Sequence, residues 1–130
     1  MRSKHLTAAL AAHQKNSVRI DSYDFGRIVV DGKEYTSDVI IFPDKVKDNW
    51  WRKEGHALHI EDIESVVKEN LEVLIVGTGK YGLLEVLQET KEYIESKGIE
   101  LIVEATDSAC EMYKEISKNK KAVAALHLTC

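Results

Sequence analysis

Hydrophobic positions are spaced differently before and after residue 60, and this difference predicts two kinds of structure. Before residue 60, short apolar runs predict strands over residues 23–30, 33–35, 38–42 and 45–51. The pair Asp31-Gly32 favours a hairpin turn between the first two strands, because both positions tolerate positive φ. This part of the chain is therefore expected to form a β-meander.

After residue 60, helical and strand patterns alternate. Apolar side chains recur at helical spacing from Ile60 to Leu71, and this helix is followed by an apolar strand over residues 73–76. Two more pairs are expected: a helix over 89–97 with a strand over 99–103, and a helix capped by Thr106 with a strand over 121–128. Residues 83–87 fit either a helix or an extended segment. Strands that alternate with helices predict an α/β fold, with a largely parallel sheet covered on both faces.

A glycine-rich loop follows the strand at 73–76. Its glycines, Gly77, Gly79 and Gly82, have the spacing G-x-G-x-x-G. In a dinucleotide-binding domain such a loop opens a helix directly, and an acid about 20 residues further on holds the ribose. Glu104 lies 22 residues after Gly82, but residues 83–87 contain no clear helix start. A tight turn that needs positive φ is the simpler interpretation, so we expect no nucleotide cofactor.

Residues 50–59 gather two tryptophans, an arginine and two histidines in ten positions. Arg52 is suited to holding a carboxylate or phosphate, and His56 can transfer a proton near neutral pH. The structural alternative is that Arg52 pairs with an internal acid, such as Glu54 or Asp62, and that one tryptophan belongs to the core. The sequence leaves both alternatives open.

Metal binding and disulfide formation are not expected. His56, His59, His127 and Cys130 are of metal-ligand types, but no local pair has the i, i+4 spacing of a helical zinc site. Cys110 and Cys130 form neither a C-x-x-C motif nor a recognisable disulfide framework. We therefore expect two unbridged cysteines and a cytoplasmic location.

Composition and charge narrow the functional classes. The 130 residues are 44% apolar with one proline, which argues against disorder across the whole chain. No apolar run approaches the ~20 residues that span a bilayer, so we expect no membrane segment. The net charge of −4 argues against nucleic-acid binding. Residues 1–20 carry four basic residues and no acid, so they are interpreted as a basic extension (a tail, a packing helix or a targeting peptide) before a single domain over 21–130.

The order and spacing of several residues resemble a known family. These residues are Trp51, Arg52, Gly55, His56, Leu58, Asp62, the Gly-Thr-Gly at 77–79, Thr106, Ala109 and Tyr113. Over residues 21–130 the chain resembles a small domain of unknown function, a family that includes the adipogenesis-associated domain protein and mitochondrial complex I assembly factor 3. The resemblance implies a three-layer α/β fold with a central mixed sheet, helices and an additional β-hairpin layer. It also implies an extended segment after the glycines and no established enzyme activity.

Two functions are consistent with these observations. The first is a non-catalytic binding or assembly module that presents an exposed Trp50 to a protein partner. The alternative is a small-molecule binding protein or enzyme that holds a small anion in a pocket at the carboxyl end of a strand. Its ligand-binding residues would be Arg52, His56, Gly77, Thr78 and Gly79. A deep pocket lined by Arg52 and His56 would favour this alternative, whereas a flat surface with Trp50 exposed would favour the first function.

Overall fold

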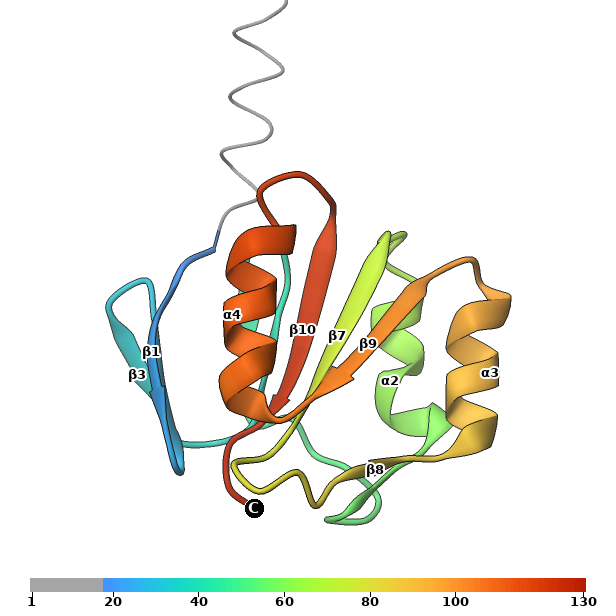
Figure 1. Cartoon of the computed structure of the whole chain (residues 1–130), viewed down its shortest axis with the longest axis horizontal. Coiled ribbons are helices and arrows are strands. Elements are labelled where there is room, and N and C mark those ends of the chain that lie inside the picture. Colours follow the sequence, from blue (N-terminus) through green and yellow to red (C-terminus); the bar gives the residue numbers. More distant parts are fainter. Residues whose placement is uncertain (1–17) are drawn as a thin grey trace, which may run out of the picture.

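A five-stranded mixed sheet lies at the centre of the structure, a computed structural model that describes residues 18–130 (Figure 1). Its strands, in spatial order, are β5 (Val46–Lys47), β4 (Val39–Ile41), β10 (Ala122–His127), β7 (Val73–Thr78) and β9 (Glu100–Glu104). β7 is parallel to both β9 and β10, and β10 is antiparallel to β4. Every residue of β7 and β10 is buried, which explains why both strands are nearly continuous apolar runs.

The two faces of this sheet are covered by different layers (Figure 1). Helices α2 (Ile60–Val67) and α3 (Gln88–Ser96) pack on one face, and α4 (Thr106–Ile116) packs on the other. A three-stranded antiparallel sheet of β1 (Ile20–Asp24), β2 (Arg27–Val30) and β3 (Lys33–Tyr35) lies beside α4, and its buried residues share one core cluster with α4 and the central sheet. The predicted α/β class, with its central mixed sheet, helices and additional hairpin layer, is confirmed.

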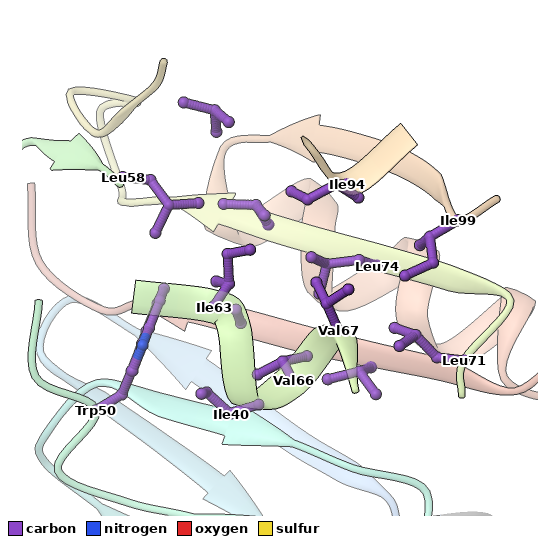
Figure 2. Packing of buried hydrophobic residues seen from close by; sticks show 14 of the residues in the cluster. Ile40, Trp50, Leu58, Ile63, Val66, Val67, Leu71, Leu74, Ile94 and Ile99 are labelled. Carbon is purple, nitrogen blue, oxygen red and sulfur yellow. The ribbon is translucent and has the colours of Figure 1, made fainter. Parts of the chain in front are cut away.

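Alternation along β7 divides the core into two clusters. Leu74 and Val76 pack with residues of α2 and α3, whereas Val73 and Ile75 pack with α4 and with the small sheet. Figure 2 shows the first cluster, in which Ile63, Val66 and Val67 of α2 lie close to Leu74. This division follows from the strand period of two, which sends successive side chains to opposite faces.

The helix–strand order was predicted correctly, and the structure settles the ambiguous segment. Residues 83–87 are extended, and β8 (Glu85–Val86) pairs in parallel with the equally short β6 (Ala57–Leu58). Gly98 follows α3 with a φ of 77°, as expected for a residue that ends a helix. Thr106 is the first residue of α4 and Ala105 is its N-cap, so the prediction that Thr106 caps the helix is wrong.

The amino-terminal strands differ from the prediction in detail. Residues 23–30 form parts of two strands, β1 and β2, because the chain turns at Phe25-Gly26, where Gly26 has a φ of 77°. The turn at Asp31-Gly32 is confirmed, with φ angles of 49° and 79°. The strand expected over 45–51 shortens to the two residues of β5. Of the expected basic extension, residues 1–17 lie outside the described residues.

Candidate functional site

Three charged or titratable side chains meet at the edge of the central sheet where β7 and β10 end. Asp38 precedes β4, Arg52 lies between β5 and β6, and His127 is the last residue of β10. The Asp38 Oδ2 atom lies 2.8 Å from Arg52 Nη1 and 2.8 Å from His127 Nδ1. The Asp38 Oδ1 atom accepts a hydrogen bond of 2.7 Å from the backbone N–H of Leu128. The carboxylate therefore joins three segments that are distant in sequence.

Burial makes this cluster a strong structural element. The Arg52 side chain is only 6% exposed, and those of Asp38 and His127 are also largely covered. Burial disfavours the charged carboxylate of Asp38, but hydrogen bonds from His127, Leu128 and Arg52 outweigh that effect, so the pKa of Asp38 is lowered. The aspartate is consequently ionised at neutral pH and holds the guanidinium in place.

Arg52 thus pairs with an internal acid, although not with either acid that the sequence suggested. Glu54 pairs with His59, and Asp62 accepts hydrogen bonds from the backbone N–H groups of Lys53 and His59. Arg52 Nη2 also lies 3.1 Å from His127 Nδ1 and donates to the carbonyl of Gly55 at 3.3 Å. The guanidinium lies over the Trp50 ring, 4.8 Å from its centroid. Only its Nε atom is buried without a hydrogen-bond partner among residues 18–130.

The glycines of the 77–79 loop accommodate the chain's own packing. Gly79 has a φ of 101°, and a Cβ atom there would lie 2.5 Å from the carbonyl carbon of Cys130. At Gly77 a Cβ atom would lie 2.8 Å from Leu126 and 2.8 Å from the hydroxyl of Thr106. These distances are too short for any side chain. The close backbone approach that glycine permits is therefore used by residues of this chain.

Hydrogen-bond donors and acceptors of the same loop are also used internally. The Gly79 N–H donates to the Thr106 hydroxyl at 2.8 Å, and that hydroxyl donates to the carbonyl of His127 at 2.6 Å. The Thr78 hydroxyl donates to the carbonyl of Glu104 at 3.1 Å. The Lys80 N–H donates to the carbonyl of Thr129 at 2.6 Å. The loop is thus held against the start of α4 and the end of β10.

The observed neighbours of the His56 side chain are Cys130 and His127. Its Nε2 atom is 4.0 Å from Cys130 Sγ, and its ring centroid is 6.3 Å from that of His127. Among residues 18–130, no group of three His, Cys, Asp or Glu side chains is arranged to hold a metal ion. Cys110 and Cys130 are both free. Burial raises the pKa of the Cys110 thiol to about 12, so that thiol is a poor nucleophile near neutral pH.

Five surface cavities of about 200 to 570 Å³ among residues 18–130 have neither Arg52 nor His56 in their lining. One of the five is lined by Trp50, Trp51 and Lys53, the sequence neighbours of Arg52. A deep pocket lined by Arg52 and His56, which would favour a small-molecule site or an enzyme, is therefore not among these five cavities.

The aromatic residues at the surface differ from the prediction. Trp50 is only 6% exposed and belongs to the core, where its indole N–H donates to the carbonyl of Asp62 at 3.1 Å, so the expectation that Trp50 is exposed is wrong. Its neighbour Trp51 is 78% exposed. Three further large apolar side chains are exposed at the edge that carries the cluster: Phe25, Tyr81 and Leu83, here called the aromatic patch.

Sequence reasoning did not single out the aromatic patch. Tyr81 and Leu83 lie in the loop after β7, and Phe25 lies in the β1–β2 turn. The rings of Phe25 and Tyr81 are 6.1 Å apart between centroids. Large apolar residues inside turn segments, next to Gly26 and Gly82, were the available signal, since turns seldom bury such side chains.

Comparison with known proteins adds the family. Residues 20–127 match the family described as protein of unknown function (DUF498/DUF598). The chain belongs to this family. The family description names no activity.

Solved structures agree with this assignment. A conserved hypothetical protein, PH1505 from Pyrococcus horikoshii OT3, is 32% identical over 86% of this chain and 99% of its own, with a TM-score of 0.77. An outer membrane protein from Bartonella henselae is 23% identical over 91% of this chain and 100% of its own, with a TM-score of 0.76. A Mth938-like domain from Bordetella pertussis is 16% identical over 85% of both chains, with a TM-score of 0.68. The last two similarities show the shared fold alone. Among the described residues of the present chain, the helices are too short or too polar to cross a bilayer.

Proposed function

We propose that this domain is a non-catalytic protein-binding module, of the kind used in assembly, and that the aromatic patch contacts the partner. The observation that carries the proposal is that the exposed rings of Phe25 and Tyr81 lie 6.1 Å apart, with the exposed Leu83 two residues further along the same loop as Tyr81. Exposed groups of large apolar side chains mark interaction surfaces, and aromatic residues are enriched in the centres of interfaces. The similarity in sequence pattern to an assembly factor, noted above, motivates the same proposal.

The patch is supported by a rigid base. The Gly26 N–H in the β1–β2 turn donates to the carbonyl of Leu128 at 2.9 Å, and the Leu83 N–H donates to the carbonyl of Cys130 at 3.0 Å. Both segments of the patch are therefore fixed to residues 128–130. Those residues are in turn fixed by the Asp38 carboxylate through the N–H of Leu128. A surface that is already ordered loses less conformational entropy when it binds.

Charged side chains border the patch on one side. Lys80 Nζ lies 3.9 Å from the carboxylate of Asp24 and 3.3 Å from that of Asp107, and it lies over the ring of Tyr23 at 5.4 Å. A polar rim around an apolar centre is the usual anatomy of a protein–protein interface. The expected partner surface is therefore apolar at its centre and of mixed charge at its border.

Binding of a small anion by Arg52, His56 and the 77–79 loop remains the alternative. The buried Arg52 Nε atom without a partner is the observation in its favour. Against it, the other guanidinium nitrogens are bonded, and the N–H groups of Gly79 and Lys80 donate internally. Arg52→Lys keeps the charge but loses the fork of donors, so under this alternative it would weaken phosphate or acetate binding about tenfold.

Photo-crosslinking tests the proposal directly. A photoreactive phenylalanine analogue is placed at Tyr81 in one sample and at the exposed Glu64 of α2 in a matched control, in cells of the native host. We expect one discrete crosslinked protein from position 81 and none from position 64. The same species should disappear when Phe25→Ser and Leu83→Ser are added, but it should persist with Trp51→Ser. Equal labelling from both positions, or labelling that survives the patch substitutions, would contradict the proposal.

A cytoplasmic location is part of the same proposal and rests on the argument from the two unpaired cysteines. Fractionation of the native host, followed by detection of the untagged protein, checks it. Recovery mainly with membranes or outside the cytoplasm would overturn this part and leave the proposed partner surface to be tested separately.

A further inference from the structure

A separate cavity lies at the opposite edge of the domain from the aromatic patch. It is formed where the chain enters β1, at the β2–β3 turn and at the carboxyl end of α4 (Figure 1). Its volume is about 570 Å³, which is within the range of small-molecule sites. Val18, Ile20 and Tyr113 are nearly fully buried and form its base. The cavity therefore offers a small molecule an apolar surface.

The hydroxyl group of Tyr113 is the feature of this cavity that points to a ligand. Tyr113 is 1% exposed, and its hydroxyl has no hydrogen-bond partner among residues 18–130. A buried hydroxyl without a partner is rare in proteins because it gives up its bonds to water without replacement. Burial, together with the negative charge of Asp31, raises the pKa of Tyr113, so the hydroxyl keeps its proton and is available as a donor.

The border of the cavity is positively charged although the protein as a whole is acidic. Arg19, Lys114 and Lys118 line it, with Asp31 as the only acid among its lining residues. The three cations form ion pairs with exposed carboxylates, at Asp21, Glu111 and Glu115. Such solvent-exposed pairs contribute little stability, so these long side chains can turn toward a ligand at small cost.

We propose that this cavity binds a small organic anion with an apolar body, of the class of medium-chain carboxylates. Lys114 with Arg19 balances the charge of the carboxylate. The Tyr113 hydroxyl is covered in this structure, and it donates to the carboxylate when the side chains that line the cavity move aside. The apolar chain packs on Val18 and Ile20. The site is distinct from the aromatic patch, so its test is independent of the proposed protein-binding function.

Asp31 provides a way to map the charge of the ligand. The Asp31 carboxylate accepts a hydrogen bond of 3.0 Å from the backbone N–H of Arg19, and Asp31 lines the same cavity as Lys114. A bound anion is repelled by this carboxylate. Asp31→Asn removes the repulsion and is compatible with the φ of 49° at this position, because asparagine tolerates the left-handed region.

Calorimetric titration of the full chain with octanoate tests the proposal, with octylamine and acetate as controls for charge and for the apolar chain. We expect octanoate to bind and neither control to bind measurably. Tyr113→Phe should weaken octanoate binding about tenfold. Without octanoate, the same substitution should leave the melting temperature unchanged or raised, since it removes an unpaired polar group. Lys114→Gln should weaken binding about threefold and Asp31→Asn should strengthen it. Lys68→Gln, directly after the end of α2, should have no effect.

Several outcomes would overturn the proposal. One is the absence of octanoate binding at millimolar concentration, and another is equal binding of octylamine. A third is a Tyr113→Phe protein that binds octanoate unchanged but melts at a lower temperature, because the hydroxyl then has a structural partner such as a bound water. If Tyr113→Phe does not fold, the opposite effects expected for Lys114→Gln and Asp31→Asn decide the question, and equal effects of the two refute it.

Discussion

Substitution of Asp38 by Asn should be among the most destabilising changes of a polar residue in this domain. The Asp38 carboxylate accepts from Arg52, His127 and the N–H of Leu128, all within 2.8 Å. Asparagine keeps the shape of the side chain, but it removes the negative charge. It also replaces one carboxylate oxygen by an NH₂ group, which is a donor and would face the donors of Arg52, His127 or Leu128. Leaving a buried cation without its partner costs about 3–5 kcal/mol. For a domain of this size that corresponds to a decrease of about 12–20 °C in melting temperature, at about 4 °C per kcal/mol.

Arg52 should be less sensitive than Asp38, and this asymmetry tests the structure. Arg52→Met removes the buried charge together with its unpaired Nε atom, and Asp38 still accepts from His127 and Leu128. We therefore expect a cost of roughly 1–3 kcal/mol for Arg52→Met. The double variant Asp38→Asn with Arg52→Met should cost less than the sum of the single changes, because the second change removes the charge that the first leaves unpaired.

Urea unfolding followed by tryptophan fluorescence measures these costs, since Trp50 lies directly beneath the guanidinium. Glu100→Gln is the matched control, because Glu100 pairs with Lys120 at the surface and should change the free energy of unfolding by less than about 1 kcal/mol. A cost of Asp38→Asn no greater than that of this control would show that the carboxylate does not hold the cluster together. A cost of Arg52→Met greater than that of Asp38→Asn would contradict the expected asymmetry.

Three further predictions concern the same region and the core. The folded-state pKa of Asp38 is lowered, so its contribution to stability is complete above the unfolded pKa of about 4 and is lost as the pH falls through the folded value. The free energy of urea unfolding should therefore fall less steeply below pH 4 in Asp38→Asn than in the unchanged protein. Gly79→Ala should lower the free energy of unfolding by roughly 3 kcal/mol and Gly32→Ala by roughly 1 kcal/mol, because both need positive φ but only Gly79 lacks space for a Cβ atom; equal costs in urea unfolding would contradict this. Mass spectrometry after brief iodoacetamide treatment at pH 7.5 should find Cys130 alkylated well before Cys110, and faster labelling of Cys110 would show that α4 opens readily.

The sequence predicts the elements of this fold better than their contacts. The buried strands β7 and β10 are recognisable because both faces are covered, which requires continuous apolar runs. The division between β1 and β2 is missed because Phe25-Gly26 lacks the Asp-Gly signal that marks the next turn. Periodicity reports which face of an element is buried, and it contains no information on a two-residue turn inside an otherwise apolar segment.

The candidate site depends on contacts that no local pattern encodes. The sequence suggests Glu54 and Asp62, two and ten residues after Arg52, as its partners. The observed partner, Asp38, lies 14 residues before Arg52 and is brought close by the pairing of β4 with β10. Trp50 and Trp51 are adjacent, so composition cannot decide which of them is buried, and the hydrogen bond from Trp50 to the start of α2 decides it in the structure. Pairings of this kind follow from the tertiary fold, whereas propensity and spacing are properties of the segment.

The glycine loop shows how one local pattern can serve two different purposes. In open α/β sheets, ligands bind at the carboxyl ends of the strands, where free N–H groups and glycines admit a phosphate. Here the backbone of residues 128–130 occupies that position, against Gly79, and accepts hydrogen bonds from Lys80 and Leu83. The segment that follows the loop is extended until α3 begins at Gln88. The next helix in the sequence therefore does not start at the loop, as it does in a dinucleotide-binding domain. Gly79 therefore lets residues 128–130 pack against the loop that carries Tyr81, and the β1–β2 turn that carries Phe25 is bonded to the same residues through Gly26. In the proposed function, this packing is what keeps the aromatic patch ordered before it binds a partner.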